Sequence, residues 1–225
     1  MFSYSTEELY SIERMFENIW GVSPAITREL IFEFLDLRLH DFVEKRRRKI
    51  DPAMVTDWGV HKEIIIIYLT IRMMKPKVIV ETGTGVGISD AYILQALARN
   101  GVPAEFHSLG VQSLNLRDFP IAYCVPDELR YHSFVKYTQY PVVIQRAVPE
   151  LLDDLGDVDI FFHDSDHCGE NMYWELEQAL PHSDILFVHD VHTNDAFLRF
   201  IEDYGLRGVM FERKDPVRSI LGVIF

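Results

Sequence analysis

The chain has 225 residues, 48% of them hydrophobic and 25% charged, which is the usual balance of one globular domain with an additional segment. Its formal net charge of −13 argues against a nucleic-acid partner, because the phosphate backbone selects clustered cations. Cys124 and Cys168 form neither a disulfide framework nor a C-x-x-C metal motif, and the N-terminus lacks a signal-peptide pattern. The longest apolar stretch is too short to span a bilayer. We therefore expect a cytoplasmic protein without a membrane partner.

Two helices are predicted at the start of the chain, over residues 5–20 and 24–49, with Ser5 and Ser23 as N-caps and apolar residues at roughly helical spacing in the second. A doubly wound sheet does not need them, so they cover a site, build a subunit contact or pad the core. We expect residues 1–55 to form this N-terminal helical cap or interface segment. Residues 56–225 are expected to form the main α/β domain.

A further helix is predicted over residues 61–74 and is apolar nearly all round. Such a helix is typically buried in a core or in an interface, which leaves a homodimer open. Pro76 ends it, and a strand begins at Val78.

The next stretch combines a strand, an acid and a glycine turn. The β-branched run Val78–Val80 leads into Glu81, and glycine then occupies alternate positions over residues 83–87. A helix is predicted from Ile88. Glycines in such a turn allow the backbone to approach a ligand closely. The chain has Ile88 where a dinucleotide fingerprint has its last glycine, so pyrophosphate is not the favoured ligand, and a plain strand-to-helix turn is the alternative.

A glutamate before G-x-G-x-G resembles the first motif of the class I S-adenosylmethionine-dependent methyltransferases. The resemblance implies S-adenosylmethionine as the cofactor, with the glycines beneath it and Glu81 near its methionine amino group. It also implies a small residue beside the adenine, at Ala147. The cofactor-binding residues implied are Glu81, Thr82, Gly83, Thr84, Gly85, Gly87, Ala147 and Asp164.

The rest of the main domain alternates strand and helix patterns, including a helix around residues 127–137. With a hairpin at the C-terminus, this predicts a Rossmann-like, doubly wound α/β sheet of seven mostly parallel strands, ending in an antiparallel pair. In the methyltransferase pattern the second strand ends in an acid that binds the ribose. Here that position is Gly110, so either Gln112 or Glu105 substitutes or cofactor binding is altered. The strands are expected in the regions of Val78, Ala104, Val142, Ile160, Ile185, Val209 and Ile220.

Two apolar segments, 159–164 and 184–190, both end in His-Asp. Because ligands bind beyond the carboxyl ends of parallel strands, the polar residues that follow should converge near the glycines. Facing carboxylates repel each other unless a cation or a proton lies between them. The adjacent His163 and His189 are expected to be hydrogen-bonded partners in the layer that covers the sheet. The residues expected to converge are Asp164, Asp166, His167, Asp190 and His192.

The stretch 162–167 resembles the Asp-Gly-Asp-His segment of a small O-methyltransferase-like subgroup, which includes macrocin O-methyltransferase-like and cephalosporin hydroxylase-like proteins. This resemblance implies Asp164 and Asp190 as ligands of a divalent metal, Mg²⁺ or another cation. It implies Asp166 or His167 as the base that takes the proton. Ser165 stands where the subgroup usually has glycine.

The predicted function is S-adenosylmethionine-dependent O-methylation of a small-molecule acceptor, with divalent-metal assistance. Two other classes stay open. One is a metal-dependent hydrolase, because His-Asp pairs also form phosphoesterase sites. The other is a catalytically silent methyltransferase-fold protein that acts by binding. Cofactor binding separates the first class from the hydrolase, and acceptor turnover separates it from the silent protein.

Overall fold

The structure is a computed structural model that describes residues 5–50, 63–110, 119–142, 144–213 and 219–225. Its helices are α1 (Thr6–Trp20), α2 (Pro24–Leu35), α3 (Leu39–Arg47), α5 (Ile64–Met74), α6 (Ile88–Asn100), α7 (Asp127–Arg130), α8 (Ile144–Leu155), α9 (Gly169–Ala179) and α10 (Ala196–Tyr204). Its strands are β1 (Val78–Thr82), β2 (Ala104–Leu109), β3 (Val135–Tyr140), β4 (Val158–His163), β5 (Ser183–Val188), β6 (Gly208–Arg213) and β7 (Ser219–Ile224).

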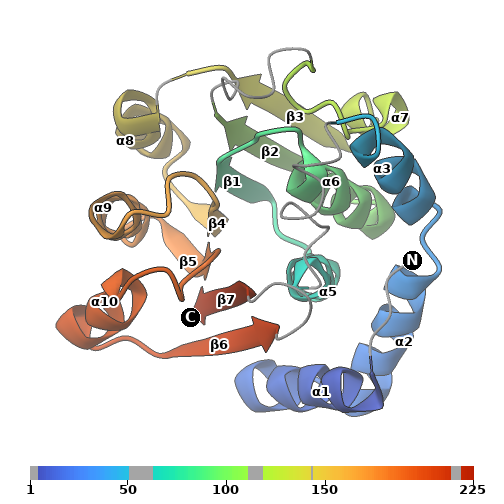
Figure 1. The fold of residues 1–225 in the computed structure, drawn as a ribbon, viewed down its shortest axis with the longest axis horizontal. Helices are drawn as coiled ribbons and strands as arrows, with labels where there is room; N and C mark the ends of the chain where they lie inside the picture. The colour runs from blue at the N-terminus through green and yellow to red at the C-terminus, as the bar shows by residue number, and fades with distance from the viewer. Residues whose placement is uncertain (1–4, 51–62, 111–118, 143, 214–218) are drawn as a thin grey trace.

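The strands form one sheet in the order β3-β2-β1-β4-β5-β7-β6 (Figure 1). Strands β1 to β5 are parallel, and β7 lies antiparallel between β5 and β6. The predicted sheet, mostly parallel with a C-terminal antiparallel pair, is therefore confirmed. The strand order reverses between β1 and β4, and ligands of open α/β sheets bind at such a point. The predicted hairpin turn at residues 214–216 lies outside the described residues.

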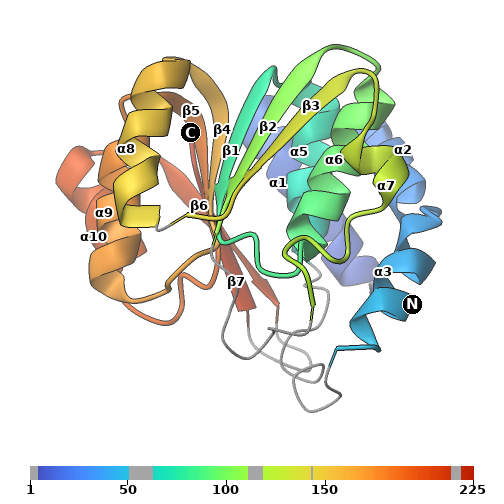
Figure 2. The same ribbon diagram turned by 90° about the horizontal axis from the view of Figure 1, so that it is seen from above.

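The sheet is the middle of three layers (Figure 2). Helices α8, α9 and α10 cover one face, and α5, α6 and the N-terminal helices lie on the other. Side chains alternate along a strand, so neighbouring residues of β1 pack on opposite faces of the sheet. Ile79 belongs to the hydrophobic core on the side of α5 and α6, and Val80 to the core on the side of α8, α9 and α10. Both faces are buried, which explains the nearly continuous apolar sequence of the central strands.

Helix α5 confirms the prediction of a buried apolar helix, since residues 64–71 are all buried. It joins α2 to the core through Glu33, which accepts hydrogen bonds from the Tyr68 hydroxyl and from Arg72 Nε, both at 2.7 Å. The N-terminal helices thus share one hydrophobic cluster with α5 and α6. None of the helices in the described part of the chain is long and apolar enough to cross a membrane.

The second predicted helix, residues 24–49, is two helices in the structure. The break after α2 lets Leu37 enter the core and brings the His40 ring back onto α2. His40 Nε2 lies 2.6 Å from the Phe34 carbonyl oxygen and Nδ1 lies 2.9 Å from the Tyr92 hydroxyl. These tertiary contacts override a periodicity that is compatible with one long helix.

The third strand was wrongly predicted around Val142. It is β3, residues 135–140, where Val, Thr and Tyr suit a pleated strand that pairs in parallel with β2. The helix predicted around residues 127–137 is only the short α7, because the residues from Val135 onward belong to β3. Residues 144–155 form α8 instead, because their apolar side chains recur at helical spacing and pack against the sheet. Those side chains are Ile144, Ala147, Val148, Leu151, Leu152 and Leu155.

Candidate active site

A pocket opens at the carboxyl ends of β1 and β4, beside α5. Its empty space, open solvent at the mouth included, is about 600 Å³. One wall is the glycine loop and the start of α6, residues 83–89. The remaining lining residues are Glu63, Ile64, Ile67, Phe162, Asp164 and His189.

The glycine loop is shaped by steric constraints that differ between its glycines. Gly83 has φ +102°, and a Cβ there would lie 1.9 Å from the Asp164 carbonyl oxygen. Gly87 has φ +76°, and its Cβ would lie 2.6 Å from the Ala122 Cα. At Gly85 glycine is needed mainly for the φ of +47°, because a Cβ added there would lie no closer than 3.8 Å to its nearest neighbour, the Gly83 carbonyl oxygen. The loop therefore lies directly against the end of β4, where Asp164 begins the second motif.

Glu81 lies behind the loop, fully buried, and is absent from the pocket wall. Ser108 Oγ donates to its carboxylate at 3.3 Å, and the nearby Asp90 accepts from the Tyr137 hydroxyl at 2.6 Å. Burial and the neighbouring Asp90 raise the pKa of Glu81 well above its ordinary value, and burial also raises the pKa of Asp90. Two buried carboxyl groups this close favour one shared proton.

The two loop threonines have different surroundings. Thr82 is buried, and its hydroxyl donates to Glu175 at 2.5 Å, so its side chain is turned toward α9 rather than the pocket. Thr84 lines the pocket, and its hydroxyl lies 2.7 Å from Ser108 Oγ. Of this predicted pair, only Thr84 is positioned to contact a ligand directly.

Gly110 directly follows β2 and lies beside the glycine loop. A Cβ at this position would lie 2.8 Å from the Thr84 backbone nitrogen. The glycine loop therefore already occupies the space that the first atoms of an acidic side chain would need. Glu105 is no substitute for a ribose-binding acid, because it lies near the amino end of β2 and pairs with Lys136 at 2.9 Å. Gln112, the other suggested substitute, lies outside the described residues.

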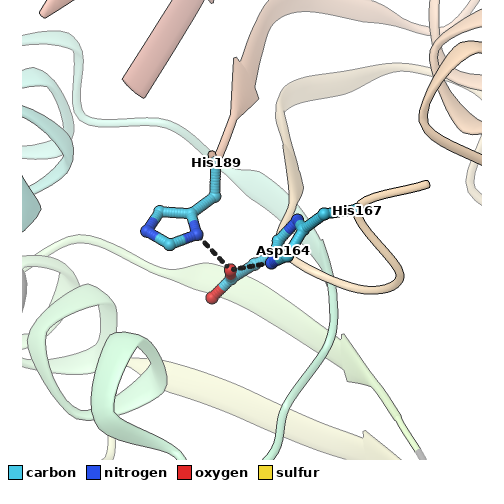
Figure 3. A group of neighbouring side chains, drawn as sticks. All are labelled: Asp164, His167 and His189. Atoms are coloured by element: carbon cyan, nitrogen blue, oxygen red, sulfur yellow. Dashed lines mark ion pairs between the residues drawn. The ribbon is translucent and has the colours of Figure 1, made fainter. Parts of the chain in front are cut away.

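Asp164, His167 and His189 converge next to the loop (Figure 3). His189 Nδ1 lies 2.9 Å from Asp164 Oδ1, and His167 Nε2 lies 3.9 Å from the same oxygen. One donor atom from each residue lies within 4.8 Å of the others. Asp164 and His167 are half-buried and His189 is buried, so the cluster is shielded but reachable.

His189 belongs to the site, although the sequence predicted a partner in the covering layer. Its other ring nitrogen, Nε2, lies 3.2 Å from Oε1 of Glu63, which is 1% exposed. Burial opposes a charged ring, but Asp164 and then Glu63 outweigh it and raise the pKa of His189 well above its ordinary value. Glu63 belongs to no recognisable motif, so the sequence did not predict it as a site residue. The one available indication was an acidic residue at the start of an otherwise apolar helix.

Asp190 lies beside the cluster. Its Oδ2 is 3.5 Å from His189 Nδ1 and 3.9 Å from His167 Nε2, and its Oδ1 is 3.7 Å from His192 Nδ1. Asp190 has φ +54°, a left-handed conformation that is uncommon for a residue other than glycine and often marks functional sites. The predicted convergence of the two strand ends is therefore seen for Asp164, His167, Asp190 and His192.

Two predicted site residues lie apart from this cluster. Asp166 is exposed, and its Oδ1 accepts the Cys168 backbone N–H at 3.1 Å, which makes a local turn. Ala147 lies in the first turn of α8 and packs against the hydrophobic core between the sheet and helices α8, α9 and α10. Neither residue lines the pocket.

The cluster has the donors for a divalent ion, since it offers a carboxylate oxygen and two ring nitrogens. Glu63 completes an arrangement common at metal sites, in which a carboxylate binds the far nitrogen of a ligand histidine and fixes its tautomer. The predicted Asp164–Asp190 pair is part of this environment, but the tightest group contains His167 and His189 in place of Asp190.

The strand order with β7 between β5 and β6, together with the glycine loop after β1, defines a Rossmann-like methyltransferase fold. Residues 80–191 match a family model described as a methyltransferase domain. This match identifies residues 80–191 as a methyltransferase domain, and the fold around it is that of the class I S-adenosylmethionine-dependent methyltransferases. No curated protein matches the chain significantly in sequence.

Solved structures share this fold over nearly the whole chain. A putative O-methyltransferase from Klebsiella pneumoniae is 16% identical, with a TM-score of 0.58 and 96% of each chain covered. The O-methyltransferase TomG from Streptomyces achromogenes, in complex with SAM, is 15% identical, with a TM-score of 0.61 and 99% of each chain covered. An O-methyltransferase from Bacillus cereus, in complex with SAH, is 13% identical, with a TM-score of 0.57 and coverage of 96% of this chain and 97% of that one.

Proposed function

We propose that the chain transfers the methyl group of S-adenosylmethionine to an oxygen atom of a small-molecule acceptor. The observation that carries this proposal is that one pocket is lined both by the glycine loop and by Asp164 and His189. The loop permits close approach of a cofactor, and the carboxylate and imidazole groups can bind and deprotonate a hydroxyl. Similar O-methyltransferases hold SAM or SAH, which supports the cofactor.

His167 is the proton acceptor in this proposal. Burial lowers its pKa against the opposing effect of Asp164, so the ring is neutral near pH 7 and has a lone pair to accept a proton. Its side chain is 29% exposed, which leaves it accessible to an acceptor. Of the two predicted bases it is preferred to Asp166, whose carboxylate makes a local turn. Methyl displacement at a sulfonium otherwise needs mainly alignment of the reacting atoms.

A divalent ion would be held by Asp164, His167 and His189. It would lower the pKa of the acceptor hydroxyl and so take over the activation that neutral His167 provides alone. Two imidazole nitrogens suit zinc, iron or nickel, whereas Mg²⁺ prefers an all-oxygen environment. Of the divalent cations that the resemblance left open, Mg²⁺ or another, the donor set therefore favours a transition metal.

The test is calorimetric titration of chelator-treated protein with S-adenosylmethionine and S-adenosylhomocysteine, alone and with Mg²⁺ or Zn²⁺. Micromolar binding is expected. Methyl transfer from labelled cofactor is then screened over catechols, phenols and sugars. Asp164→Asn should abolish turnover and spare cofactor binding, whereas Asp184→Asn, at the amino end of β5, should change neither. Absence of cofactor binding would refute the proposal, and full turnover by Asp164→Asn would remove that residue from the mechanism.

A catalytically silent binding protein is the second candidate. Gly110 favours it, because the ribose-binding acid implied by the methyltransferase pattern has no place there. Cofactor binding without turnover on any screened acceptor would select this candidate. The hydrolase alternative loses its support, because residues 80–191 match a methyltransferase domain.

A further inference from the structure

Glu175, in α9, is a buried carboxylate with hydrogen bonds from several segments. It is 0% exposed. Its Oε2 accepts from the Thr82 hydroxyl at 2.5 Å and from His163 Nδ1 at 2.7 Å. Its Oε1 accepts from the Ser165 hydroxyl at 2.5 Å and from Asn171 Nδ2 at 2.9 Å. One side chain thus joins the ends of β1 and β4 to α9.

Two of these donors adjoin the residues that form the pocket. Thr82 precedes the glycine loop at Gly83, and Ser165 follows Asp164 of the His-Asp cluster. The Asp164 backbone N–H donates to the Thr82 carbonyl at 2.9 Å, and the loop has no room for a Cβ at Gly83. The start of the glycine loop and the Asp164 cluster are therefore in direct contact. Glu175 binds the residue next to each of them through a separate carboxylate oxygen.

We propose that Glu175 is a positioning residue that fixes the distance between the glycine loop and the Asp164 cluster. It thereby aligns the sulfonium methyl group of S-adenosylmethionine with the oxygen of the acceptor. This inference rests on the proposed methyl transfer and deepens it. In-line displacement requires the reacting atoms at near-attack separation, and a shift of 1 Å can cost on the order of 10²-fold in rate. Glu175 is 0% exposed and its two oxygens accept from four protein donors, so its carboxylate is not placed to contact either reactant.

The charge of Glu175 suits this role. Burial favours the neutral acid, but hydrogen bonds from His163, Ser165 and Thr82 outweigh it and lower the pKa of the carboxyl. An ionised carboxylate accepts from all four donors at once, whereas a protonated one would have to donate at one of its oxygens. The same charge gives short, strong hydrogen bonds and a rigid connection.

The test uses variants that each remove one arm of this connection. Thr82→Val and Ser165→Ala each delete one hydroxyl and leave the His163–Glu175 pair intact. Each should lower kcat about tenfold. The dissociation constant for S-adenosylmethionine and the KM for the acceptor that the wild type methylates fastest should stay within about twofold. Because both act through one carboxylate, the double variant should lose little more than either single variant.

Matched controls separate positioning from a loss of stability. Thr70→Val and Thr27→Val each delete a buried hydroxyl that donates to a backbone carbonyl of the preceding turn, in α5 and α2 respectively. Both should lower the melting temperature as much as the test variants and leave kcat unchanged. Glu175→Gln, which keeps the shape and removes the charge, should give a larger loss of kcat than either hydroxyl deletion.

The outcomes are distinct. Unchanged kcat in Thr82→Val and Ser165→Ala, fully multiplicative losses, or equal losses in the controls would overturn the positioning role and leave methyl transfer standing. Wild-type protein that binds no cofactor or methylates no acceptor would overturn the proposed function together with this inference. A coupled loss of kcat with preserved binding supports Glu175 as the residue that sets the geometry.

Discussion

Replacing Gly110 by aspartate restores the ribose-binding acid that the methyltransferase pattern implies, yet we expect it to weaken the cofactor site. The new Cβ would lie 2.8 Å from the Thr84 nitrogen and 3.1 Å from Thr84 Oγ1. The nitrogen is backbone, so the glycine loop itself must move, which would also strain the 2.7 Å contact between the Thr84 and Ser108 hydroxyls. Overpacking of this kind costs about 1–3 kcal/mol. For a chain of this size that is a fall in melting temperature of roughly 2–12 °C.

The assay is thermal unfolding combined with calorimetric titration with S-adenosylmethionine. Gly110→Ala should show the same loss of stability as Gly110→Asp, because the Cβ causes the clash. Gly169→Ala is the control, since its Cβ would approach Asn194 no closer than 3.4 Å. Tighter cofactor binding by Gly110→Asp at unchanged stability would refute the reasoning and would mean that position 110 is an empty ribose anchor.

Further predictions concern the proton acceptor, the buried acid and the loop. His167→Gln should lower kcat by roughly 10²–10⁴-fold and keep cofactor affinity, whereas His182→Gln, at the opposite end of the sheet, should leave both kcat and cofactor affinity unchanged. The raised pKa of Glu81 means that the folded state holds its proton after the unfolded chain has lost it, so this group destabilises the fold as pH rises from about 4.5 through the folded pKa. Denaturant unfolding should therefore show Glu81→Gln gaining stability relative to wild type over that range, and a constant difference would count against it. Gly83→Ala should abolish S-adenosylmethionine binding in the same titration, because its Cβ would overlap the Asp164 carbonyl; retained micromolar affinity would show that the loop tolerates displacement.

Local sequence determined the main features of the fold. The run Val78–Val80, the glycines and the helix after them are set by neighbouring residues, because β-branched preference, glycine freedom and helical periodicity all act within a few residues. Strand ends marked by Asp164 and Asp190 could be predicted to meet, since parallel strands share a carboxyl edge. The third strand was missed because short apolar runs around residues 135–145 fit a strand or a helix equally well until β2 provides a pairing edge.

Tertiary structure decided which side chains share the site. Glu63 and His189 are separated by 126 positions, and no local pattern predicts that they lie 3.2 Å apart. The same holds for Glu175, whose bonds reach Thr82 across 93 positions. Gly110 was interpreted from the sequence as a missing acid, but the packing of Thr84 against it gives the residue a steric reason. Sequence fixes backbone type through short-range preference, whereas distances between side chains depend on how the strands and helices pack against one another.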